Sequence, residues 1–455
     1  MTIGEKKEGI LLIKTKACVL YRNFTHGKVL EQIDWLMNEC CPAIKRQKVS
    51  PEELERGRET FHLAVHGLLE LAGNYGFAGN LWHTYLAFLL VNNENTFSKA
   101  CEIVGSVEGS INGLALHDLR IFKELFEFDL HGLDQIFGTD FVPVIERYTQ
   151  AEDNGKLFNK RIRDRICHLS VELAGTDTAE TFMQALVHFY KEFGVGRLGL
   201  NKAFRVQEGE DGGARIVPIT NIAHVYLEDL VGYEIPKRKL IENTEAFVAG
   251  RRANNCLLFG DAGTGKSSSI KGILNRYYEQ GLRIIEVYKH QFKYLNDIIA
   301  QIKNRNYRFI IYMDDLSFEE FEIEYKYLKA VIEGGLEKKP ENILIYATSN
   351  RRHLVRETFS DKNDVRTNEE LHTTDTVQEK LSLVARFGVT IYFGSPTPKE
   401  FKEIVRALAV RYHVDMPEEE LLFEANKWEL AHGGLSGRTA QQFIDYLLGK
   451  MTAHP

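Results

Sequence analysis

The chain has 455 residues, of which 44% are hydrophobic and 27% charged, with a formal net charge of −7 at pH 7. These values exclude a disordered or fibrous chain and predict a globular protein of two or three domains. The mild negative charge argues against attraction of the whole surface to nucleic acid or to an anionic membrane. The 6 cysteines form no C-x-x-C pair, so we expect neither a disulfide framework nor a zinc knuckle.

The apolar stretches of the chain are short. The run before Lys14 has four residues, which is too few for a signal peptide. The longest stretch, LAFLLV at 86–91, is far shorter than the roughly 18 residues that a membrane-spanning helix needs. We therefore expect a cytoplasmic protein.

Residues 1–204 have the pattern of a mainly α-helical domain. One helix is predicted with Ser50 as its N-cap, Pro51 at its first position and Glu53 completing a capping box. Apolar residues then recur at the spacings of one helix face. Similar patterns follow along this region without an internal repeat. The sequence does not disclose a role for this domain.

Two histidines of this region, His62 and His66, lie at positions i and i+4, so they would share one face of a helix. Histidines at this spacing bind zinc when a glutamate follows the first of them, and Leu63 stands there instead. We therefore favour a structural role for both side chains over metal binding.

The pattern changes after the helical region. Residues 205–218, RVQEGEDGGARIVP, are charged and rich in glycine, which predicts a linker or a hairpin loop. Over residues 219–395, short apolar runs alternate with amphipathic segments. Strands that are apolar throughout and separated by helices indicate an α/β domain whose parallel sheet has helices on both faces. Residues 396–455 return to a helical pattern.

A glycine-rich segment in the α/β region, Gly260–Ser267, reads GDAGTGKS and fits the phosphate-loop pattern G-x-x-x-x-G-K-[ST]. The run CLLF predicts a strand before it, and KSSSIKGILNRYY predicts a helix after it, which is the context that this pattern requires. Glycines let the backbone fold around a phosphate with its N–H groups pointing inward, where a Cβ would obstruct. The helix that begins at Lys266 adds the positive end of its dipole.

This loop predicts the binding of a nucleotide together with Mg²⁺. Lys266 is expected to reach the β- and γ-phosphates, and the Ser267 hydroxyl is expected to ligate Mg²⁺. A chance glycine-rich turn is the alternative, and the pattern and its context together disfavour it. The predicted nucleotide-binding residues of the loop are Gly260, Asp261, Ala262, Gly263, Thr264, Gly265, Lys266, Ser267 and Ser268.

A pair of acidic residues ends a later apolar run. RFIIYMDD predicts a buried strand that ends at Asp314 and Asp315, and Asp314 stands 48 positions after Lys266. Adjacent carboxylates repel each other unless a cation or a reaction needs them. We predict that Asp314 holds Mg²⁺ through water and that Asp315 orients or deprotonates an attacking water. For Asp315, the cap of a following helix stays an alternative.

Three more polar residues complete an ordered set. ILIYATSN predicts a strand that ends at Asn350, on the same sheet edge as the phosphate loop, where an amide can position water without adding charge. Arg386 is predicted at the end of a helix before the last strand, and Arg438 at the start of a helix in the C-terminal segment. A single arginine at either position is typical of a surface ion pair. The two arginines are informative only because they follow the phosphate loop, the acidic pair and Asn350 in this order along the chain.

In these features, residues 220–450 resemble the AAA+ ATPases, and in particular a bacterial AAA+ family of unassigned function. The matching stretches include GDAGTGKSSSIKGIL, RFIIYMDDLSFEE, EKLSLVARFG and LSGRTAQQFIDYL. The resemblance implies a P-loop NTPase fold with a C-terminal helical lid at 396–455, and ATP and Mg²⁺ as cofactors. It also implies a homo-oligomer with nucleotide between its subunits. It does not cover the helical N-terminal domain.

The resemblance also implies roles for single residues. Asn350 takes the sensor-1 position, Arg386 the arginine-finger position and Arg438 the sensor-2 position. The residues that would lie against the adenine are Val231, Gly232 and Tyr233.

Three functions remain open at this point. The first is an ATPase that couples the binding and hydrolysis of Mg-ATP to conformational change or to the remodelling of an assembly. The second is a nucleotide-gated scaffold with little turnover, because many AAA+ proteins have Asp-Glu where this chain has Asp314-Asp315. The third is a helicase-loader-like ATPase that binds nucleic acid, because aromatic and basic residues mix at 288–297. We favour an ordinary helix start as the explanation of that segment.

Two other segments bear on these alternatives. A GTPase needs a base-reading N-K-x-D pattern, and NKWE at 426–429 ends in glutamate, so we set that class aside. The polar stretch at 357–380 has no apolar period, and we expect it to be mobile and to become ordered when nucleotide or a partner binds.

Overall fold

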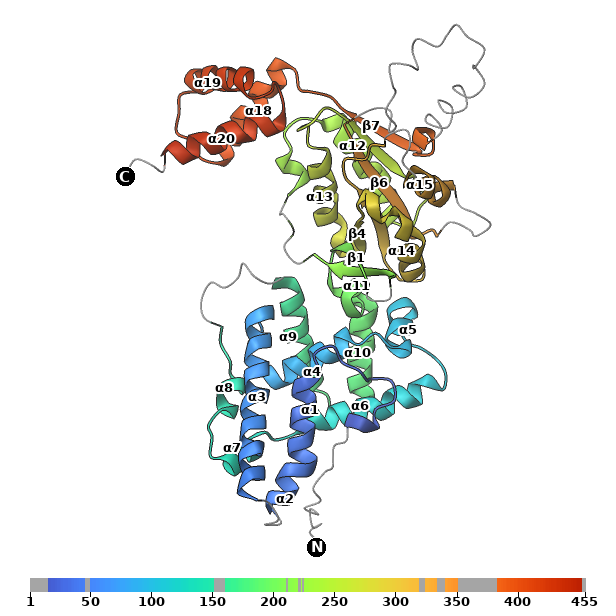
Figure 1. The fold of residues 1–455 in the computed structure, drawn as a ribbon, viewed down its shortest axis with the longest axis vertical. Coiled ribbons are helices and arrows are strands. Elements are labelled where there is room, and N and C mark those ends of the chain that lie inside the picture. The colour runs from blue at the N-terminus through green and yellow to red at the C-terminus, as the bar shows by residue number, and fades with distance from the viewer. Residues whose placement is uncertain are drawn as a thin grey trace. The chain divides into compact units, whose positions relative to one another are not determined.

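The computed structural model divides the chain into two compact units, Met1–Asn201 and Lys202–Pro455 (Figure 1). The residues that it describes are 15–45, 50–150, 160–209, 212–219, 222, 225–318, 324–333, 340–350 and 383–451. The polar stretch predicted at 357–380 lies outside them. The finer boundary predicted between 219–395 and 396–455 stays a prediction.

The first unit is built from helices packed around one apolar core. Its centre is α4, which is buried on nearly all sides, as expected for a helix that is apolar all round. The helices of this unit are α1 (Lys28–Trp35), α2 (Cys41–Lys45), α3 (Pro51–Tyr75), α4 (Leu81–Asn92), α5 (Thr96–Val104), α6 (Ile111–Glu127), α7 (His131–Phe137), α8 (Val142–Glu146), α9 (Lys160–Ala174), α10 (Ala179–Phe193) and α11 (Gly196–Leu200).

The predicted capping box at the start of α3 is confirmed. The Ser50 hydroxyl accepts a hydrogen bond from the Glu53 N–H at 3.2 Å, and the Ser50 N–H donates to Glu53 Oε2 at 2.8 Å. Of the two histidines on this helix, His62 lies edge-on to the Phe141 ring, with the ring centroids 5.2 Å apart. The described contact of His62 is therefore one of packing.

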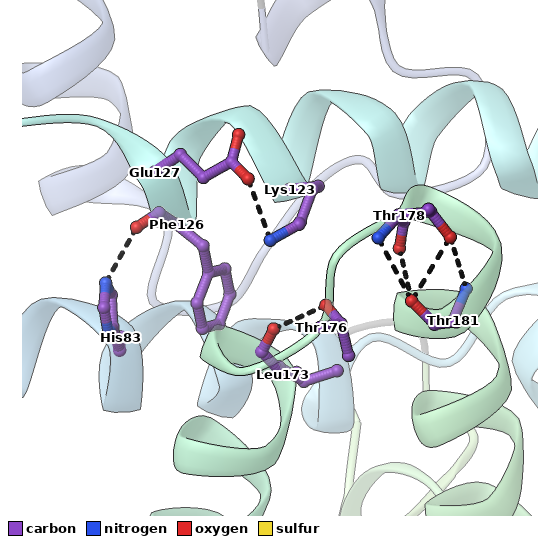
Figure 2. Close-up of polar contacts among 8 residues, drawn as sticks. All are labelled: His83, Lys123, Phe126, Glu127, Leu173, Thr176, Thr178 and Thr181. Carbon is purple, nitrogen blue, oxygen red and sulfur yellow. Dashed lines mark hydrogen bonds and ion pairs between the residues drawn. The ribbon is translucent and has the colours of Figure 1, made fainter.

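Local polar contacts close the helix ends of this unit (Figure 2). Thr178 and Thr181 form a reciprocal cap at the start of α10, with each backbone N–H donating to the other residue's hydroxyl at 3.2 Å. His83 stacks on the Phe126 ring, and its Nε2 lies 2.8 Å from the Phe126 carbonyl oxygen. Burial lowers the pKa of His83. These contacts satisfy backbone groups inside the unit, which is a structural use of polar residues.

The second unit contains a sheet of seven strands in the order β2-β1-β4-β5-β6-β3-β7. All neighbouring strands are parallel except β1 and β2, which are antiparallel. The strands are β1 (Ala203–Glu208), β2 (Ala214–Pro218), β3 (Cys256–Gly260), β4 (Leu282–Glu286), β5 (Arg308–Met313), β6 (Ile343–Ser349) and β7 (Val389–Phe393). The predicted α/β fold with a mainly parallel sheet is confirmed.

Helices cover this sheet, and further helices come after its last strand in the sequence. In Figure 1, α13 lies on one side of the sheet and α14 and α15 lie on the other. Successive residues of β5, such as Ile310 and Ile311, point to opposite faces, and both are fully buried. The helices of the unit are α12 (Glu234–Val248), α13 (Lys266–Tyr277), α14 (Leu295–Ile302), α15 (Glu324–Glu333), α18 (Pro398–Arg411), α19 (Glu418–Ala431) and α20 (Gly437–Met451).

The structure corrects the prediction for residues 205–218. They are not a linker, because most of them lie in β1 and β2, which pair as a hairpin from Phe204↔Pro218 to Glu208↔Ala214. The strand β1 also pairs with β4, so the hairpin belongs to the sheet. The physical reason is the alternation of buried Val206 and Ile216 with more exposed neighbours, which the glycines of the hairpin tip concealed in the sequence.

The register of the parallel strands β3, β5 and β6 determines where the candidate site lies. Met313 at the end of β5 pairs with Ala347 of β6, and Phe259 of β3 pairs with Ser349 of β6. Because parallel strands end at the same sheet edge, the residues that follow these positions lie together there. The helices α18, α19 and α20 form a separate apolar core beside this edge, against which Val231 packs. In the described part of the chain, no helix is long and apolar enough to cross a membrane.

Candidate functional site

A pocket of about 710 Å³ lies at this sheet edge, between the start of α13 and the helices α18 and α20. The segment before α12, the glycine loop and the ends of β5 and β6 also contribute to it. The predicted site residues that line it are Val231, Tyr233, Ala262, Gly263, Thr264, Gly265, Lys266, Ser267, Ser268, Asp314, Asp315, Asn350 and Arg438.

The backbone of the loop needs its glycines. Gly260, Gly263 and Gly265 have φ angles of 139°, 75° and 87°, in a region that residues with a Cβ rarely adopt. At Gly260, a Cβ would also collide with the carbonyl oxygen of Phe393 on the neighbouring strand β7. The sequence pattern and the loop geometry therefore have the same physical cause.

Lys266 is buried inside this loop, 6% exposed. Its Nζ donates hydrogen bonds to the carbonyl oxygens of Gly260 at 2.9 Å and of Asp261 at 2.6 Å. Burial lowers the pKa of the Lys266 amine, while the nearby aspartates oppose this shift. The ammonium group is thus held by the carbonyl oxygens of the loop that it belongs to.

Asp261 ties the loop to the chain after β7. Its Oδ2 accepts hydrogen bonds from the Ser395 N–H and from the Ser395 hydroxyl, both at 2.8 Å. These two bonds hold the pKa of the Asp261 carboxyl below its ordinary value. Asp261 and Gly260 therefore anchor the loop from outside the pocket lining.

Asp314 is the centre of a hydroxyl cluster at the end of β5. Its Oδ1 accepts hydrogen bonds from Ser267 Oγ at 2.7 Å, Tyr312 OH at 2.6 Å and Thr348 Oγ1 at 2.5 Å. Partial burial raises the pKa of the Asp314 carboxyl, but the three hydroxyl donors outweigh burial and lower it below its ordinary value. The carboxylate is therefore charged at neutral pH, beside the first turn of α13.

Asp315 and Asn350 meet across neighbouring strands. Asn350 Nδ2 donates to Asp315 Oδ1 at 2.7 Å, and the Asp315 N–H donates to Thr348 Oγ1 at 3.0 Å. Asp315 has a φ of 49°, which is uncommon for a residue with a side chain. The described contact of its carboxylate is with Asn350, and not with a helix that it would cap.

The two predicted arginines differ in their positions. Arg438 lies at the start of α20 and lines the pocket, and its backbone N–H donates to the Gly263 carbonyl oxygen at 3.2 Å. Arg386 does not line the pocket and forms an ion pair with Glu333 at the end of α15. The structure therefore brings Arg438, but not Arg386, to the phosphate loop.

An apolar part of the pocket lies beside the predicted adenine segment. Val231 and Tyr233 line it together with Ile404 and Leu408 of α18, whereas Gly232 does not. The Tyr233 ring lies 5.6 Å from the Phe393 ring, and burial raises the pKa of Tyr233 to about 12. Such a surface suits the flat face of a base.

Sequence reasoning missed three residues of this site. Arg411 at the end of α18 lines the pocket and binds Asp229 through an ion pair of 3.1 Å. Tyr312 and Thr348 hold Asp314, as described above. The position of Tyr312, two residues before Asp314 in a strand, signals a side chain on the same face. Thr348 needs the register of two strands, which the sequence does not supply.

Oxygen atoms at the loop suit a magnesium ion. Ser267 Oγ and Asp314 Oδ1 lie 2.7 Å apart, and Mg²⁺ prefers hydroxyl and carboxylate oxygens. Within the described ranges, no group of three or more His, Cys, Asp or Glu side chains could hold a metal ion. A hydroxyl and a single carboxylate fit an ion that shares its remaining ligands with phosphate and water.

The mainly parallel sheet, the glycine loop and the helices that follow β7 form an α/β unit of the P-loop kind. The chain belongs to the family described as "Protein of unknown function (DUF815)", which matches residues 200–451. The predicted membership of a family of unassigned function is confirmed. A comparison with curated proteins finds no match.

Solved structures with similar folds have low sequence identity to this chain. The FIGL-1 AAA domain in complex with ADP is 16% identical, with a TM-score of 0.35, and the match covers 51% of this chain and 76% of that chain. A single-residue variant of RuvB from Thermotoga maritima is also 16% identical, with a TM-score of 0.32, and the match covers 49% of this chain and 71% of that chain. At these TM-scores the likenesses carry no conclusion about the site.

Proposed function

We propose that the chain is an ATPase that couples the binding and hydrolysis of Mg-ATP to a conformational change or to the remodelling of an assembly. The observation that carries this proposal is the 2.7 Å hydrogen bond between Ser267 Oγ and Asp314 Oδ1. It joins the glycine loop to a charged strand end 47 residues away, at a place where hydroxyl and carboxylate oxygens suit Mg²⁺. Hydrolysis of a nucleoside triphosphate requires at least a loop that binds the phosphates and a carboxylate that holds the metal ion.

The side chains would divide this chemistry as follows. Lys266 and the loop N–H groups bind the phosphates, and Ser267 and Asp314 hold Mg²⁺, which neutralises charge on the phosphate oxygens. Asp315 and Asn350 lie 2.7 Å apart and would orient the attacking water. Arg438 lines the same pocket and would contact the phosphates from the lid.

Phosphate release by the wild-type chain and by Asp315→Asn tests this proposal. The substitution keeps the shape of the side chain but removes its charge, so we expect turnover to fall by about 100-fold. Nucleotide affinity should stay within about twofold of wild type, because Asp315 does not belong to the phosphate loop. Equal rates in the two proteins would contradict an ATPase that uses Asp315.

A specific observation supports a second candidate, the nucleotide-gated scaffold. The Asp315 side chain is one methylene shorter than a glutamate side chain, and its carboxylate already accepts a hydrogen bond from Asn350. A shorter side chain held in this way reaches less far towards a water at the phosphate. A scaffold would show the same negligible phosphate release in wild type and in Asp315→Asn, together with normal nucleotide binding.

We further propose that the active form is a homo-oligomer in which Arg386 acts on nucleotide bound by a neighbouring copy. The support is that Arg386 carries a charge outside the pocket of its own chain, paired with Glu333. Arg386→Ala should lower turnover by about 1,000-fold and leave nucleotide affinity unchanged. The control is Arg406→Ala, which removes an exposed arginine paired with Glu418 at 2.7 Å. Equal turnover of Arg386→Ala and wild type would refute the assignment.

The segment that suggested the nucleic-acid alternative is buried in part. Phe292 and Tyr294 are 1% and 9% exposed, and Phe292 packs against Phe318. Buried rings cannot stack on the bases of a single strand. Tyr288 is 46% exposed and stacks on His290, so the alternative rests on these two side chains and stays a prediction.

A further inference from the structure

One tyrosine of the sheet directs its hydroxyl at the site instead of the core. Tyr312 lies in β5, two residues before Asp314, and is 5% exposed. Its hydroxyl donates to Asp314 Oδ1 at 2.6 Å. A buried hydroxyl costs free energy unless it forms a hydrogen bond, so a phenylalanine would pack here at lower cost if the sheet alone mattered. The hydroxyl therefore serves the carboxylate.

All three hydroxyls of the cluster bind the same oxygen of Asp314. Ser267, Tyr312 and Thr348 donate to Oδ1 at 2.5 to 2.7 Å, and none of them donates to Oδ2. Three donors fix the position of this oxygen and therefore the plane of the carboxylate. The remaining oxygen belongs to a residue that lines the nucleotide pocket. The cluster thus holds one side of the carboxylate and leaves the other side for a ligand.

The three donors are not equivalent. Ser267 belongs to the phosphate loop, so its hydroxyl is shared between Asp314 and the ion that the loop is proposed to bind. Tyr312 belongs to the sheet alone. Thr348 lies between the two acids, because its Oγ1 donates to Asp314 and accepts the Asp315 N–H at 3.0 Å. Tyr312 and Thr348 are therefore fixed supports, whereas Ser267 takes part in ligand binding.

We propose that Tyr312 and Thr348 are positioning residues that set the affinity for the magnesium ion by holding Asp314 Oδ1. This inference rests on the proposed function and deepens it. The two hydroxyls orient the carboxylate before the ion arrives, so the ion does not have to order it. Tyr312 does not line the pocket, so the affinity for nucleotide without metal is independent of its hydroxyl, whereas Thr348 also lines the pocket and is tested through the Mg²⁺ midpoint alone.

The chain offers a matched control for Tyr312. Tyr346 is its register partner on the neighbouring strand β6 and is fully buried. Its hydroxyl accepts from Asn243 Nδ2 at 2.9 Å and lies 3.0 Å from Thr244 Oγ1, on α12 and not at Asp314. Tyr312→Phe and Tyr346→Phe thus delete the same atom from the same sheet, but only the first deletion touches the acidic residue.

The experiment titrates a fluorescent ATP analogue against the full-length proteins, first with EDTA and then over a range of Mg²⁺ concentrations. We expect Tyr312→Phe to bind the analogue as wild type does in EDTA, and to need about 10-fold or more Mg²⁺ for its half-maximal effect. Tyr346→Phe should keep the wild-type Mg²⁺ midpoint. A wild-type midpoint for Tyr312→Phe, or an equal shift in both variants, would overturn the proposal.

A second pair of variants covers the case in which Tyr312→Phe does not fold. Thr348→Ser keeps the hydroxyl and should keep the Mg²⁺ midpoint, whereas Thr348→Val keeps the shape and should raise it. Equal midpoints for these two variants would overturn the role of Thr348. The wild-type titration distinguishes failure of the proposed function from failure of this inference alone. If wild type binds no analogue at any Mg²⁺ concentration, the proposed function fails, and this inference fails with it.

Discussion

The two units of the chain use multiply bonded carboxylates for different ends. In the helical unit, Asp118 is fully buried and accepts the backbone N–H groups of Val19, Leu20 and Tyr21 at 2.7 to 3.0 Å. In the second unit, Asp314 is exposed to a pocket and accepts three side-chain hydroxyls. The first carboxylate completes the hydrogen bonding of a chain segment, and the second is fixed but still open to a ligand.

A second aspartate of the helical unit also completes the hydrogen bonding of one chain segment. Asp134 is 7% exposed and accepts the N–H groups of Phe141 and Val142 and the hydroxyl of Thr139. All its partners lie within eight residues, so it shapes a local turn. The donors therefore distinguish the two uses. Backbone donors from one segment mark a structural carboxylate, whereas hydroxyls from separate strands around an open pocket mark a candidate site.

Of the two carboxylates compared here, Asp314 has the larger expected effect when it is replaced by alanine. Without the carboxylate, the proposed ion loses its fixed support, so we expect phosphate release to fall by about 100-fold or more. The buried hydroxyls of Tyr312 and Thr348 would lose their acceptor, so the free energy of unfolding should also fall, by about 1 to 2 kcal/mol. Phosphate-release assays and urea unfolding of the same preparation measure both quantities. A loss of stability without a loss of turnover would place Asp314 with the structural carboxylates.

A smaller effect of the opposite kind is expected from Asp118→Ala. Three backbone N–H groups would lose their acceptor, and that of Tyr21 is buried, so the free energy of unfolding of the helical unit should fall by about 2 kcal/mol. Affinity for nucleotide should not change at a temperature where the variant is folded. Urea unfolding followed by circular dichroism gives the first quantity and calorimetry the second. Unchanged stability together with weakened nucleotide binding would break the comparison between the two units.

The sequence predicted those parts of the site that depend on local pattern. The loop from Gly260 to Ser267 needs glycines and a lysine at fixed spacing, and the strand that ends at Asp314 is apolar without interruption. These requirements act within a few residues of the chain, so they are visible in a single sequence.

Features that depend on strand register or on distant contacts could not be predicted. The contact between Thr348 and Asp314 requires that β5 and β6 are neighbours in one particular register. The ion pair between Arg411 and Asp229 joins residues 182 positions apart. The two strands within 205–218 were missed, because the glycine-rich tip between them outweighed their alternation and predicted a linker or a hairpin loop. In each case the deciding interaction is tertiary, and a local pattern does not record it.

The central claim is that a magnesium–nucleoside triphosphate binds in the loop around Lys266. Calorimetry of wild type, Lys266→Ala and Lys271→Ala with Mg-ATP tests it most directly, because Lys271 is an exposed lysine on the same helix. We expect wild type and Lys271→Ala to bind with equal affinity and Lys266→Ala to show binding at least about 10-fold weaker. No heat with wild type, or an unchanged affinity for Lys266→Ala, would contradict the account.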